Sequence, residues 1–291
     1  MTTRVLIVGA DATGMSAASQ ALRRAGRDTL SVVAFEGGCH VSYSACGIPY
    51  WVAGDVAGPD ALIARSVAEH RANGIDLRLR TEVTEIDMNA RTVRAAPLDG
   101  GASYQVEFDD LVLATGAVPV RPDLPGVQAP GVYGVQTLED GAAVLSGLTG
   151  SPRRAVVVGG GYIGIEMAEA MVRRGLAVTV VDQAPEPMPT LDPDMGALVR
   201  KAMDGMGIEV LTDTPVAGFD TGSDGRVSAV ITQDGALPAE VVVLGLGVRP
   251  NTELARTVGL PLGEHGGLLT DLQMRVLGHE GVWAGGDCVE V

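Results

Sequence analysis

The sequence is poor in cysteine, in positive charge and in long apolar runs. It holds 3 cysteines in 291 residues and no CxxC pair, which excludes a disulfide-stapled scaffold or a zinc ribbon and is typical of a reducing compartment. Only 21 Lys and Arg stand against 36 Asp and Glu, for a formal charge of −15. Binding to nucleic acid or to an anionic membrane surface is therefore disfavoured, and we expect phosphate groups to be met by backbone amides.

Membrane spans, a secretory signal and metal-ligand spacing are also missing. Apolar runs such as 241–244 end at a glycine, far short of the roughly 20 residues that a transmembrane helix needs. The N-terminal residues lead straight into a strand and not into a signal peptide. The histidines have no metal-ligand spacing, and we expect solvated loop residues at all four: His40, His70, His265 and His279. These absences predict a soluble, cytoplasmic protein without a metal site.

Glycine is abundant, with 40 residues, and glycines mark an order of predicted elements that occurs twice in the chain. An apolar strand over 5–8 ends at Gly9, a helix is predicted over 14–24, and a second strand over 30–35 ends at Glu36. The same order recurs as strand 155–158, Gly159, helix 162–174 and strand 178–181 ending at Asp182. The pattern predicts two βαβ units.

The likeness between the two copies continues beyond these units. GID at 74–76 matches GIE at 207–209, and LATGAVP at 113–119 matches LGLGVRP at 244–250. The offset between the copies falls from 150 at the first glycines to 133 at GID, so the first copy holds about 17 extra residues before GID, most of them between Glu36 and Ile75. Short strands are predicted in both copies after this point, over 82–87, 92–95, 105–108, 216–220 and 227–232.

The second glycine loop, GGGYIG at 159–164, predicts a dinucleotide site. Gly159 permits the tight turn, Gly161 lets the backbone approach a pyrophosphate, and Gly164 brings the helix against the strand. Asp182, 18 residues after Gly164, would accept hydrogen bonds from the adenosine ribose. Because Gln183 and not an arginine follows Asp182, NADH is favoured, with NADPH left open.

The first glycine loop, GADATG at 9–14, is a weaker match because Asp11 stands where the middle glycine is expected. Its strand–turn–helix context and Glu36, 22 residues after Gly14, support a second dinucleotide site. Two different dinucleotides in one chain favour a flavin beside a nicotinamide, since hydride can pass between them. Asp287, after the last strand, offers a carboxylate to a polyol such as the ribityl chain of a flavin.

These observations predict an α/β fold of two Rossmann-like domains of the three-layer ββα type. The NAD domain is expected to be inserted into the FAD domain. The FAD-binding domain would comprise residues 1–148 and 249–291, and the NAD(P)H-binding domain residues 149–248. The proline-rich segments at 118–130 and 151–152 mark the crossing between them.

Taken together, the paired loops, LATGAVP, LGLGVRPN and WAGGD at 283–287 resemble the pyridine nucleotide-disulfide oxidoreductase superfamily along essentially the whole chain. VSYSACGIPY at 41–50 is similar to the single-cysteine branch of CoA-disulfide reductases, NADH oxidases and NADH peroxidases. The resemblance implies that FAD is held by Gly9, Ala10, Gly14, Glu36, Val83 through its backbone, Thr115, Gly116 and Asp287. It implies that NAD(P)H is held by Gly159, Gly161, Tyr162, Ile163, Glu166, Asp182 and Gly247, with Tyr162 as a gate over the flavin and Glu166 near the nicotinamide.

Cys46 matches the redox cysteine of that branch. Pro49 suits the first turn of a helix, so we expect Cys46 at the positive end of a helix dipole, where a thiolate is favoured. Cys39 and Cys288 lack such a setting and are expected to have no redox role. Ser16, Gln20, Arg23 and Ser42 match the coenzyme A-binding positions of the CoA-disulfide reductases. Two positions depart from that group, since Ala45 replaces an Asn beside the cysteine and Asn73 replaces a Lys.

The resemblance implies an FAD-dependent enzyme that passes hydride from NADH through flavin to Cys46, which then reduces a small disulfide, with CoA disulfide as the expected substrate. Two alternatives stay open. In one, oxygen or peroxide is the acceptor and Cys46 cycles through a sulfenic acid; in the other, the chain is a non-catalytic, cofactor-binding redox sensor or fragment. The family is homodimeric through a C-terminal interface domain, and the sequence ends four residues after Asp287, so that domain is expected to be missing here.

Overall fold

Two parallel five-stranded sheets form the frame of the computed structural model, which describes residues 2–290. Each sheet belongs to one of two units. The first unit holds the described residues before Ala45, Ile63–Val118 and those after Val248, and the second holds Ala45–Leu62 and Pro119–Val248. The chain passes between the units at 44–45, at 62–63, in β8 (Ala117–Pro119) and in β17 (Val248–Pro250). The strands β8 and β17 pair with each other.

The sheet of the first unit has the order β18-β7-β1-β2-β3 and is parallel throughout. Its strands are β1 (Thr3–Val8), β2 (Leu30–Phe35), β3 (Ile75–Arg78), β7 (Asp110–Leu113) and β18 (Val282–Ala284). An antiparallel sheet follows, made of β4 (Thr81–Asp87), β5 (Thr92–Pro97) and β6 (Tyr104–Glu107). The helices of this unit are α1 (Ala12–Ala25), α3 (Val67–Ala72) and α7 (Glu253–Thr257).

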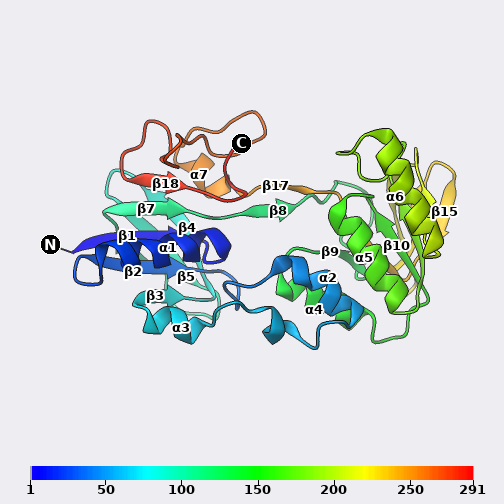
Figure 1. Cartoon of the computed structure of the whole chain (residues 1–291), viewed down its shortest axis with the longest axis horizontal. Coiled ribbons are helices and arrows are strands. Elements are labelled where there is room, and N and C mark those ends of the chain that lie inside the picture. The colour runs from blue at the N-terminus through cyan, green and yellow to red at the C-terminus, as the bar shows by residue number, and fades with distance from the viewer. Residues whose placement is uncertain (1, 291) are drawn as a thin grey trace. The chain divides into compact units, whose positions relative to one another are not determined.

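Alternation along β1 explains the layers of this unit. Leu6 and Val8 pack in one core cluster with residues of the three-stranded sheet, while Val5 and Ile7 pack in another with residues of α1. Successive side chains of a strand point to opposite faces, so a strand that is apolar at every position is buried on both. Figure 1 shows α1 lying along β1 and β2, on which it packs.

The second unit repeats this arrangement. Its parallel sheet has the order β12-β11-β10-β16-β9, with strands β9 (Val132–Gly134), β10 (Arg154–Val158), β11 (Ala177–Val181), β12 (Glu209–Leu211) and β16 (Val241–Leu244). The three-stranded antiparallel sheet is β13 (Val216–Thr221), β14 (Val227–Thr232) and β15 (Gly235–Pro238). The helices are α2 (Ile48–Ala53), α4 (Leu138–Gly147), α5 (Tyr162–Arg173) and α6 (Pro193–Gly205).

The predicted fold class, α/β with two Rossmann-like units of which one is inserted in the other, is confirmed. The compact units divide at other residues than the predicted domain limits. Residues 119–148 group with the second unit because β9 pairs with β16 at the edge of its sheet. Ala45–Leu62 groups with it because α2 packs on α4 and α5. The assignment of 1–148 with 249–291 to FAD and of 149–248 to NAD(P)H stays a prediction about ligands.

Within residues 2–290, no helix combines the length and the apolar character that crossing a bilayer requires.

Candidate functional site

The glycine loops of the two units have the same geometry. Gly9 has φ +95° and Gly159 has φ +103°, a left-handed conformation that favours glycine. A Cβ added to Gly14 would lie 1.9 Å from the carbonyl oxygen of Gly9, and one added to Gly164 would lie 1.9 Å from that of Gly159. Neither position has room for a side chain, so each helix starts with its backbone directly against the strand–helix turn.

An acidic side chain closes each loop in the same way. Glu36 accepts hydrogen bonds from the amide of Ala10 at 2.8 Å and from that of Gly38 at 2.8 Å. In the second unit, Asp182 accepts from the amide of Gly160 at 2.5 Å and from that of Ala184 at 2.8 Å. Each carboxylate is held at the end of its second strand, and its remaining lone pairs can accept from ribose hydroxyls.

The two helices differ at the residue that precedes them. Gly161 precedes α5 with an extended backbone (φ −79°, ψ −174°), and the atom nearest to an added Cβ is 3.9 Å away. Asp11 precedes α1, and its carboxylate accepts from the amide of Tyr43 at 3.4 Å. Burial raises the pKa of Asp11, with a smaller contribution from the nearby Glu36 carboxylate. The start of α5 is therefore open to the close approach of a pyrophosphate, whereas the start of α1 carries a carboxylate.

The other residues expected at FAD also belong to the first unit. Val83 is buried in β4 beside a β-bulge. The Thr115 hydroxyl donates to the carbonyl oxygen of Asn251 at 2.6 Å, and Gly116, with φ +65°, accepts from the amide of Asn251 through its carbonyl. Asp287 is exposed just after β18.

The residues expected at NAD(P)H all belong to the second unit. Tyr162 is the first residue of α5 and its side chain is 64% exposed; Ile163 follows it and is half-buried. Glu166 lies one turn further along α5, and burial raises its pKa, with a smaller effect from the Glu169 carboxylate. Gly247, with φ +82°, is exposed near the end of β16.

Cys46 lies in a single 3₁₀ turn, Ala45–Gly47, and is exposed. The helix expected after it is present as α2, with Pro49 in its first turn. Cys46 and α2 belong to Ala45–Leu62, a segment that precedes Ile75 in the first copy but groups with the second unit.

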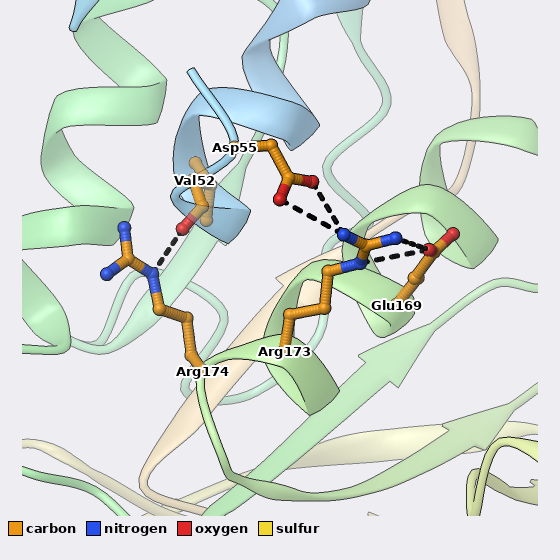
Figure 2. A network of polar contacts seen from close by, with 5 residues as sticks. All are labelled: Val52, Asp55, Glu169, Arg173 and Arg174. Carbon is orange, nitrogen blue, oxygen red and sulfur yellow. Dashed lines mark hydrogen bonds and ion pairs between the residues drawn. The ribbon is translucent and has the colours of Figure 1, made fainter. Parts of the chain in front are cut away.

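Two arginines at the end of α5 hold α2 in place (Figure 2). Arg173 bonds both carboxylate oxygens of Asp55, at 3.0 and 2.8 Å, and its other nitrogens bond Glu169 on the preceding turn of α5. The Nε of Arg174 donates to the carbonyl oxygen of Val52 at 2.5 Å. The segment that carries Cys46 is therefore tied to the helix that begins at the second glycine loop.

The four residues expected at coenzyme A lie together in the first unit. Ser16, Gln20 and Arg23 of α1 and Ser42 line a single cavity of about 560 Å³. Their spacing along α1 places the first three on one face of the helix, because residues three and four apart are neighbours there.

Sequence reasoning missed two basic residues beside this cavity. Arg65 lines it, and Arg23, Arg27 and Arg65 together line an adjoining cavity of about 360 Å³ with Asn73. None of the three guanidinium groups forms an ion pair with a carboxylate in the described part of the chain. In a protein of charge −15, these arginines form a local cluster of positive charge, and guanidinium groups are suited to hydrogen-bonding phosphate. No sequence pattern joins these arginines, since they come together only in the fold.

His70 is not a solvated loop residue, so that prediction is wrong. It lies in α3, its side chain is 2% exposed, and its Nε2 is 2.9 Å from the Oγ of Ser42. Burial lowers the pKa of His70, as does the charge of Arg65 to a smaller extent. The reason is local: Ser66 and Glu69 form a capping box that starts a helix and turns His70 inward. The S-x-x-E spacing at 66–69 is the signal that could have found it.

Comparison with known proteins identifies the family. Residues 3–291 match the family model described as pyridine nucleotide-disulphide oxidoreductase. The chain belongs to this family. It is 34% identical, over 99% of its length, to a protein named NADH oxidase from Methanocaldococcus jannaschii and to one named NAD(P)H sulfur oxidoreductase (CoA-dependent) from Pyrococcus furiosus. The chain spans 63% of the length of each of these relatives.

A solved structure, that of an NAD-dependent persulfide reductase from A. fulgidus, superposes with a TM-score of 0.94 at 35% identity. The match covers 99% of this chain and 53% of that one. The resemblance inferred from the motifs is thus confirmed at the level of the family.

Proposed function

We propose that the chain is the cofactor-binding part of an FAD-dependent NADH oxidoreductase in which Cys46 reduces a small, coenzyme A-based disulfide. The main observation in favour of this substrate is the cavity lined by Ser16, Gln20, Arg23 and Ser42. Its serine and glutamine side chains and its arginines suit a ligand that has both amide groups and phosphates. Cys46 follows Ser42 by four residues, which span at most about 14 Å when fully extended.

The first unit would hold FAD and the second NADH. Three features support these assignments: the glycine loops, the carboxylates of Glu36 and Asp182, and the open start of α5 at Gly161. When bound, the flavin would supply the route by which two electrons pass from NADH to a disulfide. Asp182 favours NADH, because a 2′-phosphate would meet its carboxylate and no arginine follows it.

The residue of the chain that would react with the substrate is Cys46, through its thiolate. Its thiolate attacks one sulfur of the CoA disulfide, so that a mixed disulfide with Cys46 forms and the first CoA leaves as a thiolate. Two electrons from NADH then break the mixed disulfide, which releases the second CoA and restores the Cys46 thiolate. The sum is NADH, one proton and CoA disulfide giving NAD⁺ and two CoA thiols.

Mass spectrometry of the oxidised protein tests this function. Treatment with CoA disulfide should add one CoA mass to the peptide that contains Cys46, and NADH with FAD present should remove it. Cys46→Ser should show no adduct but should still bleach bound FAD when NADH is added, while Cys39→Ser should behave like the parent. An adduct on another cysteine, or none, would overturn the proposal.

A sulfenic acid on Cys46 in place of the CoA adduct would favour the second candidate. In that function oxygen or peroxide is the acceptor, and the relative named NADH oxidase supports it. Absence of any NADH turnover with FAD bound would instead favour a non-catalytic redox sensor. The homodimer of the family and the cytoplasmic location stay predictions.

A further inference from the structure

His70 is a nearly fully buried histidine beside the cavity, and the proposed chemistry does not use it. Its ring lines the cavity at Ser42. Nε2 meets the Ser42 Oγ at 2.9 Å, and Nδ1 is buried with no hydrogen-bond partner among the described residues. A buried polar atom without a hydrogen-bond partner costs free energy of folding, so the position of the His70 ring lowers the stability of the fold.

The orphaned Nδ1 selects one tautomer of the ring. A neutral imidazole has one N–H donor and one acceptor nitrogen. A buried N–H without an acceptor is rarer in proteins than an under-used lone pair. The proton therefore belongs on Nε2, which donates it to Ser42 Oγ. One of the two lone pairs of that oxygen is then occupied by His70, and the hydroxyl proton of Ser42, which His70 does not accept, is left to be donated elsewhere.

The backbone of Ser42 is held in an uncommon conformation, and this restricts where its hydroxyl group can point. Ser42 has φ +51°, in the left-handed region, and its carbonyl accepts from the amide of Ala64 at 2.8 Å. Such a conformation persists in a non-glycine residue only where its surroundings determine it. The backbone contact and the His70 contact together do so from two sides.

We propose that His70 is a positioning residue that makes the Ser42 hydroxyl a hydrogen-bond donor into the cavity, so that the site selects a ligand with an acceptor oxygen at that point. An amide carbonyl or a phosphate oxygen of coenzyme A has this chemistry, so the ligand named here rests on the proposed function. A ligand that offers only an N–H or an ammonium group to Ser42 would leave this hydroxyl proton without an acceptor.

The charged groups around Ser42 and His70 are consistent with a neutral imidazole ring at His70. Arg65 and Glu69 face His70 from its own segment, Arg23 faces the cavity from α1, and Asp11 lies on the other side at the amide of Tyr43. No carboxylate among the described residues reaches Nδ1, so nothing compensates a second ring proton.

The tautomer can be measured without any ligand. In protein labelled with ¹⁵N histidine, long-range ¹H–¹⁵N correlation spectra distinguish protonated from unprotonated ring nitrogens. We expect the His70 signals, assigned by their loss in His70→Gln, to show a proton on Nε2 and none on Nδ1 at neutral pH. A proton on Nδ1 alone, or on both nitrogens, would overturn the proposal.

A double-mutant cycle tests the consequence for binding, with coenzyme A as the probe. Losing one hydrogen bond should weaken binding about fivefold in Ser42→Ala. His70→Leu should weaken it by a similar factor in the parent and by none in the Ser42→Ala background. His70→Gln, whose Nε2 donor reaches to about the same place, should restore most of the affinity, and His265→Ala, an exposed histidine elsewhere in the unit, should change nothing.

Additive losses in the cycle, or no rescue by glutamine in a variant whose thermal unfolding matches the parent, would overturn the positioning role. If the parent itself fails to bind coenzyme A, the proposed substrate is wrong, and the tautomer in the ligand-free protein still decides the role of His70.

Discussion

The second glycine loop offers a pair of substitutions that separate a packing role from a ligand role. Gly164→Ala and Gly161→Ala each add one methyl group, three residues apart. At Gly164 the added Cβ would lie 1.9 Å from the carbonyl oxygen of Gly159, whereas at Gly161 the nearest atom is 3.9 Å away. Gly205→Ala at the end of α6, where nothing lies within 4 Å of an added Cβ, is the matched control.

The magnitudes follow from these distances. Because Cβ atoms essentially never come within 3.0 Å of a heavy atom, α5 must move by about 1 Å to admit the methyl group of the Gly164→Ala variant, at a cost of about 1–3 kcal/mol of unfolding free energy. Gly161 has a backbone that alanine adopts without strain, so Gly161→Ala should leave the unfolding free energy unchanged or raise it by up to about 1 kcal/mol. Its methyl group would, however, fill the approach to a pyrophosphate, and NADH binding should weaken by about tenfold or more.

Chemical unfolding and NADH titration of the three variants check this reasoning. We expect Gly164→Ala to lose stability, Gly161→Ala to lose NADH affinity alone, and Gly205→Ala to lose neither. Unchanged NADH affinity in Gly161→Ala would mean that the loop does not contact the dinucleotide. Equal destabilisation by both loop variants would mean that the packing at Gly164 has been misread.

Three further predictions concern charge. Asp182→Ala combined with Gln183→Arg should shift the preference from NADH toward NADPH, measured as the ratio of flavin reduction rates; an unchanged ratio would contradict the role of Asp182. Arg65→Gln should weaken binding of coenzyme A more than that of its 3′-dephospho form, as measured by calorimetry, and equal losses would remove Arg65 from the phosphate site. The pKa of Asp11 is raised in the fold. Its unfavourable effect on stability is therefore absent below its unfolded pKa of about 3.9, grows between that pKa and the higher folded pKa, and is complete above the folded pKa. Asp11→Asn should be more stable than the parent at pH 7 but not at pH 3 in chemical unfolding, and the reverse order would refute this sign.

The repeated parts of the fold can be predicted because their residues act locally. Apolar strands, a glycine that tolerates φ > 0 and an acid at the next strand end are each visible in the sequence, and their second occurrence supports the first. The sequence predicts a helix over 162–174, and α5 runs Tyr162–Arg173. Five of the six strands of the two antiparallel sheets also lie where predicted, because short β-rich runs are bounded there by turn residues, whereas β15 (Gly235–Pro238) was not predicted.

The environment of His70 cannot be predicted in the same way. Its burial depends on a capping box, on a left-handed serine 28 residues earlier and on the packing of a short helix. Likewise, Arg27 and Arg65 are 38 residues apart in the sequence and meet only around one cavity. Contacts of this kind have no period, so neither composition nor motif spacing indicates them.

The comparison of the two copies explains where specificity resides. In both copies an acid, Glu36 or Asp182, accepts from the amide of the second residue of the glycine turn, and the parallel strands have the same order. The frame that the copies share is therefore suited to hold a dinucleotide in each. The first copy differs in the longer segment between Glu36 and Ile75, which carries Ser42, Cys46 and His70. The corresponding segment of the second copy, between Asp182 and Ile208, is shorter. The longer segment supplies the proposed thiol and part of the cavity. Chemistry beyond dinucleotide binding should therefore be altered by substitutions in this segment, while substitutions in the repeated frame should alter the cofactors first.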